Sequence, residues 1–232
     1  MSKLLIAASL LFALAANATA SESGFAQPPP AAADKAPLLG SGVIAPPHAV
    51  DRASVRAALA KARASNLAAF HAYQLKGVFP SNTFKPGKLN VWRDEAGHFC
   101  AAATLIKMSG QDDLVTRIAE NNNFIRLADV KQGPLMDWIL VSGLTQAEIA
   151  AIQEPFMPVV DEPQLEPAKP ILVDAKLRKA EDARLRAKYR AVDKMIAKNA
   201  KQSLDRATDR LMKHPALAWQ LVANQRIDFG AQ

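Results

Sequence analysis

The chain has 232 residues, half of them hydrophobic, with a net charge of +7 at pH 7 and one cysteine. A single cysteine excludes an intrachain disulfide, so stability must come from a packed core, and the length leaves room for one ordinary domain with appendages. Alanine, leucine, lysine and arginine dominate, while glycine and aromatic residues are few. This composition favours a mainly α fold over an all-β one.

The first twenty residues, MSKLLIAASLLFALAANATA, predict a secretory signal peptide. A short positive start is followed by an apolar run and then by Ala18-Thr19-Ala20, a small-x-small cleavage site. The run is too short to span a membrane comfortably, although an uncleaved N-terminal anchor remains the alternative. We therefore expect a periplasmic or secreted protein, cut after Ala20, with no transmembrane span in the mature chain.

Residues 21–48 are rich in proline and alanine and have no apolar period. This composition is typical of a disordered or polyproline-like tether, or of a passive tail. A helix is predicted to begin after Asp51 and to end at Gly77, which suits a C-terminal cap. Residues 89–99 read as a small hairpin with a turn at Asp94 to His98.

Four shorter helices are expected after this turn, over 100–108, 110–121, 133–143 and 144–155. The last has the clearest signal, because Thr145 and Glu148 form a T-x-x-E capping box and Pro155 follows it. Residues 49–158 should therefore form a compact multi-helix domain with a small β-hairpin.

A Pro-rich linker is predicted over 159–173, followed by a separate long basic helix over 174–214 and an apolar tail over 215–232. The long helix has no proline or glycine before Pro215. An apolar seam runs along it at near-heptad spacing, which resembles a weak coiled coil. The seam residues are Leu185, Tyr189, Val192, Ile196, Ala200, Leu204, Ala207 and Leu211.

The net excess of positive charge in the chain lies entirely in this helix. Residues 174–214 hold thirteen basic and six acidic residues, a net +7 that equals the excess of the whole chain. In one interpretation the seam packs on the compact domain or on a second copy, and the lysines are a solvated face. In the other, the basic face meets an anionic envelope polymer or lipid headgroups. The candidate interaction residues are Lys188, Arg190, Lys194, Lys198, Lys201, Arg206 and Arg210.

Cys100 is the main candidate for chemistry. A cysteine that begins a helix after a glycine-containing turn resembles the nucleophile of papain-like and transglutaminase-like thiol enzymes, which implies a histidine base later in the chain. The only later histidine is His214, beyond the linker, while His98 and His71 precede the cysteine. A thiol-dependent hydrolase or transferase using Cys100 with His98 or His71 is thus the alternative to a buried, space-filling cysteine.

The four histidines are scattered without metal-ligand spacing, and no phosphate-binding glycine loop is present. We expect no cofactor and no metal, and no nucleic-acid partner for an exported chain. The sequence therefore favours an exported, non-enzymatic envelope protein that self-associates or docks through its basic helix.

Residues 73–157 carry a recurring set of short motifs. An FP-x-N loop precedes a D-x-x-G-x-x-C-A segment and a G-L-T-x-x-E-x-A-x-I-Q helix. This set resembles an exported bacterial helical domain of unknown function. The resemblance implies a discrete domain and carries no activity with it.

Overall fold

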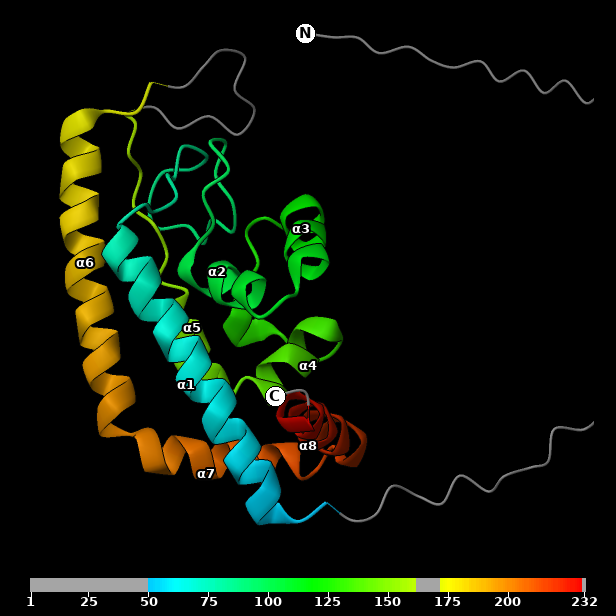
Figure 1. The fold of residues 1–232 in the computed structure, drawn as a ribbon. Coiled ribbons are helices and arrows are strands. Elements are labelled where there is room, and N and C mark those ends of the chain that lie inside the picture. The colour runs from blue at the N-terminus through cyan, green and yellow to red at the C-terminus, as the bar shows by residue number, and fades with distance from the viewer. Residues whose placement is uncertain (1–49, 162–171, 231–232) are drawn as a thin grey trace, which may run out of the picture. The chain divides into compact units, whose positions relative to one another are not determined.

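The computed structural model describes residues 50–161 and 172–230, with side chains described as far as 224. All of them belong to one compact unit, residues 44–232. The described part is mainly helical, as the composition predicts, and contains no strand (Figure 1). Its helices are α1 (Arg52–Lys76), α2 (Ala101–Met108), α3 (Asp112–Asn121), the 3-10 helix η1 (Leu127–Asp129), α4 (Pro134–Val141), α5 (Gln146–Ile152), α6 (Ala175–Lys198), α7 (Ala200–Leu211) and α8 (Pro215–Gly230).

Local capping chemistry sets the ends of several helices. The Asp51 side chain accepts hydrogen bonds from the first-turn N–H groups of Ala53 and Ser54, so α1 begins where the sequence predicts. Gly77, at φ 63°, closes that helix in a left-handed conformation. The predicted capping box of α5 is also confirmed, since Thr145 and Glu148 each bond the other's backbone N–H.

The expected hairpin is reduced to a single turn. Within the described ranges there are only isolated bridges, one of which joins Arg93 and Phe99 in antiparallel fashion across the Asp94–Gly97 turn. A second bridge pairs Leu89 with Phe156, so this backbone bonds to the segment after α5 instead of extending a two-stranded arm.

One hydrophobic core joins α1 to every other α-helix of the described chain. Its largest fully buried side chains include Trp92, Tyr189, Phe70 and Phe156, which come from four different segments. The first turns of α8 pack on the fold, because α8 contacts α1 and α4 and Ala218 is buried, whereas Trp219 is 48% exposed. No single described helix is both long and apolar enough to cross a membrane; only α4 and α5 together, bent by 103°, reach that length and composition.

The predicted long basic helix differs from the structure in two respects. It breaks at Asn199, whose φ of −100° and ψ of 7° leave the helical path, and α7 turns away from α6 at this point (Figure 1). It is also not separate, because its seam residues Leu185, Tyr189, Val192, Ile196, Leu204, Ala207 and Leu211 belong to the common core. No proline or glycine in the sequence predicts this bend.

The residues at the two ends of the predicted linker are joined by a backbone hydrogen bond. The backbone N–H of Asp174 donates to the carbonyl of Val159 at 2.8 Å, and Val159 is fully buried. The linker therefore starts and finishes at one place on the fold. Residues 162–171 within it, the signal peptide over 1–20 and the tether over 21–48 lie outside the described residues.

Candidate functional site

The turn before Cys100 is held by one buried carboxylate. Asp94 accepts hydrogen bonds from the backbone N–H groups of Ser81 (3.0 Å) and His98 (2.8 Å), and its side chain is almost fully buried. Gly97 has φ 82°, which the turn requires. In the FP-x-N loop, the Asn82 side chain bonds the backbone of Lys85 and other loop residues and is fully buried. The motif residues thus build the loop structure.

Cys100 is buried at the start of α2. Its Sγ accepts a long hydrogen bond from the N–H of Ala103 at 3.4 Å, as the N-terminal cap of the helix. Burial raises the pKa of the thiol to about 12, although the backbone hydrogen bonds from Ala103 and Ala102 act in the opposite direction. The thiol therefore keeps its proton at neutral pH, whereas a nucleophilic cysteine needs the thiolate.

Both histidines that could serve Cys100 lie beside carboxylates. His98 Nδ1 lies 3.1 Å from Asp94 Oδ2, and His71 Nε2 lies 3.3 Å from Asp193 Oδ1 on α6. Among the described residues, neither forms a hydrogen bond with Sγ of Cys100. Tyr73 and Tyr189 lie in the same core as Cys100, and burial raises the pKa of each phenol. Neither hydroxyl has a hydrogen-bond partner of good geometry.

We predict that the folded protein resists iodoacetamide at pH 7 and that the unfolded chain reacts much faster under the same conditions. The pKa of the thiol is about 12 in the folded protein and about 9 in an unfolded chain. The free energy of unfolding should therefore fall as the pH rises from 9 to 12. Chemical unfolding of the wild type and of Cys100→Ser over this range isolates the thiol, since serine keeps the cap and does not ionise. Rapid alkylation of the native state would contradict the burial of Cys100.

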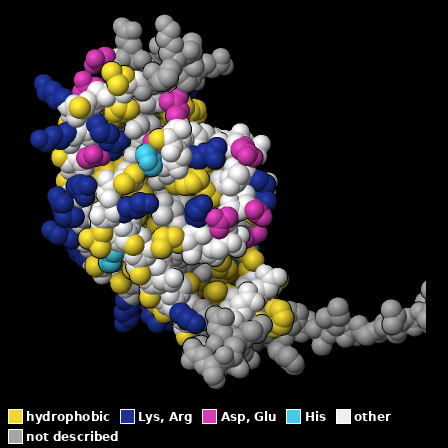
Figure 2. Space-filling model, turned by 45° about the horizontal axis from the view of Figure 1, so that its top comes forward, with side chains coloured by type: hydrophobic (Ala, Val, Ile, Leu, Met, Phe, Trp, Pro, Cys, Tyr) yellow, Lys and Arg dark blue, Asp and Glu magenta, His cyan; other side chains and the backbone are white. Residues whose placement is uncertain are grey.

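The second candidate site is the outer face of α6 and α7. The apolar sides of these helices are buried, so their cations point outward, and Figure 2 shows Lys and Arg side chains gathered along the edge formed by α6. Five predicted interaction residues are exposed and have no ion-pair partner among the described residues: Arg190, Lys194, Lys198, Lys201 and Arg206.

The other two predicted interaction residues already have polar partners within the described part of the fold. Lys188 lies 3.6 Å from the buried carboxylate of Glu154, which Arg184 also binds at 2.7 Å. Arg210 is half-buried and donates to Gln146 Oε1 on α5 at 3.3 Å. These two cations stabilise helix contacts and are not free for a partner.

Three of the free cations meet at the bend between α6 and α7. Lys198, Lys201 and Arg206 line a surface hollow of about 400 Å³ together with the side chains of Asn199 and Gln202. The two carboxylates at this hollow are already paired across to α1: Asp205 with Arg56 at 2.8 Å and Asp209 with Arg52 at 2.7 Å. Sequence reasoning missed the hollow, because only the bend at Asn199 brings these residues together.

Within the described ranges, no three His, Cys, Asp or Glu side chains are placed to hold a metal ion. Comparison of the chain with protein-family models, with curated proteins and with solved structures found no match. The function must therefore be inferred from the geometry of the chain itself.

Proposed function

We propose that the protein is an exported, non-enzymatic envelope component that docks on an anionic surface through the outer face of α6 and α7. The observation that carries this proposal is the set of five exposed, unpaired cations on these helices, three of which line one hollow. Export is supported by the signal-peptide pattern of the first twenty residues. The ligands would be phosphate or carboxylate groups of lipid headgroups or of an acidic polymer.

Docking on an anion is favoured over self-association. The apolar seam, which the sequence offers as a surface for a second copy, is covered by α1 and the other core helices. What remains outside carries like charges, and two such faces repel each other. The cations also have room for a partner, since the carboxylates of the hollow are occupied by Arg52 and Arg56.

We predict that residues 21–232 bind vesicles containing phosphatidylglycerol and do not bind pure phosphatidylcholine. Neutralising two cations in Lys198→Gln/Lys201→Gln should weaken binding about 30-fold, because each Lys or Arg near an anionic surface contributes about 1 kcal/mol. Co-sedimentation with vesicles, and retention on immobilised polyglutamate for the polymer, would measure the effect.

The matched control is Arg117→Gln/Lys131→Gln, which removes the same charge from two exposed positions, one on α3 and one between η1 and α4. This control should bind as the wild type does. Equal weakening in both variants would mean that only the net charge matters, and absence of binding to both vesicles and polymer would refute the proposal.

A further inference from the structure

A second cavity, of about 440 Å³, lies between the end of α1, α2 and the turn at Gly97. Small-molecule sites in proteins have volumes of about 300–1,000 Å³, so it is large enough for a ligand. None of the residues of the basic hollow lines it, and it makes no use of the proposed docking face. Its wall is largely apolar and includes Ala72, the side chain of Tyr73, Val78, Phe99 and Met108.

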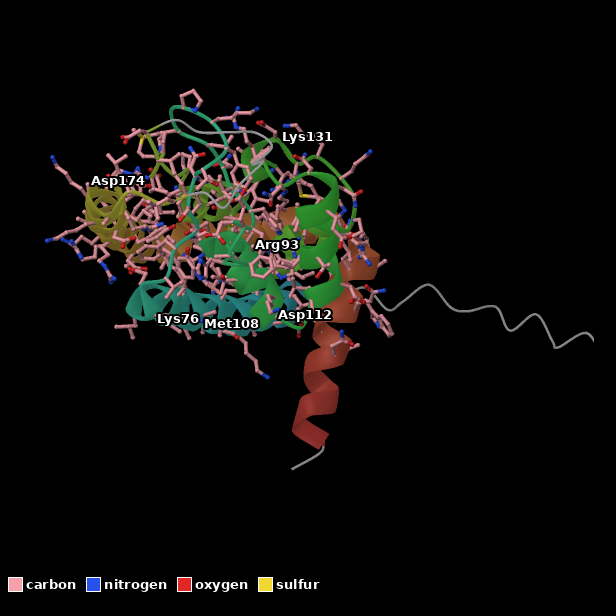
Figure 3. The ribbon with its side chains drawn as sticks, turned by 90° about the horizontal axis from the view of Figure 1, so that it is seen from above. Lys76, Arg93, Met108, Asp112, Lys131 and Asp174 are labelled. Atoms are coloured by element: carbon pink, nitrogen blue, oxygen red, sulfur yellow. The ribbon has the colours of Figure 1, made fainter. Side chains whose placement is uncertain are left out.

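Apolar side chains at the mouth of this cavity are unusually exposed. Met108 ends α2 with 60% of its surface exposed, and Val78, which follows the cap of α1, is 39% exposed. Figure 3 shows Lys76 and Met108 along the same edge of the fold, at the ends of α1 and α2. A contiguous patch of exposed apolar side chains often marks a binding site, whereas a single exposed apolar side chain is normal.

The lining of the cavity includes basic but no acidic side chains. Lys76, Lys107 and His98 line it, and no aspartate or glutamate does. Lys76 has no ion-pair partner among the described residues. Lys107 lies 3.2 Å from Asp112, but both side chains are more than half exposed, and an exposed pair of this kind contributes little and is easily exchanged. An anion at the mouth would therefore meet two available ammonium groups.

We propose that this cavity binds a free single-chain amphiphile with an anionic headgroup, such as a fatty carboxylate. The alkyl chain would lie against Val78, Phe99 and Met108, and the carboxylate would lie near Lys76 and Lys107. The combination of a largely apolar wall and a lining with two lysines and no carboxylate selects this chemistry: a cationic amphiphile would meet like charge, and a purely polar anion would leave the apolar wall in water.

The test is isothermal titration of residues 21–232 with sodium decanoate below its micelle concentration. We expect saturable 1:1 binding, and at least tenfold weaker binding of decyltrimethylammonium, which has the same chain and the opposite charge. Lys76→Glu should weaken decanoate binding at least tenfold, while Lys179→Glu, at an exposed position on α6, should leave it unchanged. The variant Lys198→Gln/Lys201→Gln should also bind decanoate normally, which separates this site from the docking face.

Two further variants test whether the cavity itself is filled. Ala72 is exposed, so Ala72→Trp should obstruct the cavity without disturbing the core, and Met108→Glu should place a carboxylate beside the alkyl chain. Both should abolish decanoate binding while the thermal unfolding of the free protein stays cooperative. Undiminished binding in either folded variant, equal binding of the two amphiphiles, or binding to lipid vesicles without binding to the monomer would overturn the proposal.

Discussion

Replacing Arg63 by methionine should lower the free energy of unfolding by about 3–5 kcal/mol, because it leaves the carboxylate of Glu148 buried without its counter-ion. Arg63 and Glu148 are 6% and 2% exposed and form a two-point ion pair at 2.7 and 3.0 Å. Arg63 also donates to the carbonyls of Gly143 and Ile196, so it ties α1 to the α4–α5 turn and to α6.

Urea unfolding at pH 7 would measure the loss, with Arg56→Met as the matched control. Arg56 pairs with Asp205 on the surface, where such a pair contributes less than about 1 kcal/mol. Equal losses in the two variants would contradict the structural role of the buried pair. The double variant Arg63→Met/Glu148→Leu should recover part of the stability, because it removes the stranded charge.

The contribution of the Arg63–Glu148 pair to the free energy of unfolding depends on pH. Burial acts to raise the pKa of Glu148, but the hydrogen bonds from Arg63 and from the N–H of Thr145 outweigh it, so the pKa lies below its ordinary value. In the wild type this contribution is present above pH 4.5 and is lost as the pH falls further. In Arg63→Met the hydrogen bond and the charge of Arg63 no longer lower the pKa of Glu148, and burial, the largest single effect, is opposed only by the hydrogen bonds from Thr145 and Ser203. The pKa should therefore rise, so lowering the pH from 7 to 5 should narrow the difference in the free energy of unfolding between the variant and the wild type.

Replacing Tyr189 by alanine should destabilise the fold by about 3–5 kcal/mol, the usual cost of removing a buried aromatic ring. Tyr189 is fully buried on α6, and its ring centroid lies 5.5 Å from those of Phe70 and Phe79 and 5.8 Å from that of Tyr73. This cluster fastens the basic helix to α1.

Arg190, the neighbour of Tyr189, provides the control because it is exposed and has no ion-pair partner among the described residues. Arg190→Ala should change the free energy of unfolding by less than about 0.5 kcal/mol. Tyr189→Phe should be neutral or stabilising, because the hydroxyl it removes is buried without a good hydrogen-bond partner. Thermal and urea unfolding of the three variants test this. A loss in Tyr189→Ala as small as that in Arg190→Ala would mean that α6 is a detachable helix.

The sequence predicted those features whose chemistry is local. Asp51, Gly77 and the Thr145–Glu148 box fix helix ends through contacts within a few residues, and the structure places each as expected. The burial of Cys100 was also foreseeable, because a cysteine among alanines and aliphatic residues behaves as a small hydrophobe.

Features that depend on distant contacts could not be predicted. The capping box gave Glu148 a role, but its partner Arg63 lies 85 residues away and interrupts the apolar face of α1. No proline or glycine near Asn199 predicts the helix break there. The hollow that this break creates could therefore not be predicted from the sequence.

If the cations on α6 and α7 contact an anionic surface, vesicle binding should depend on salt through those cations. The Debye length falls from about 10 Å at 0.1 M salt to about 3 Å at 1 M, so attraction between exposed charges is screened progressively. Affinity for phosphatidylglycerol vesicles should fall steeply with salt in the wild type and in Arg117→Gln/Lys131→Gln, and less steeply in Lys198→Gln/Lys201→Gln. The same slope in all three proteins would contradict the account.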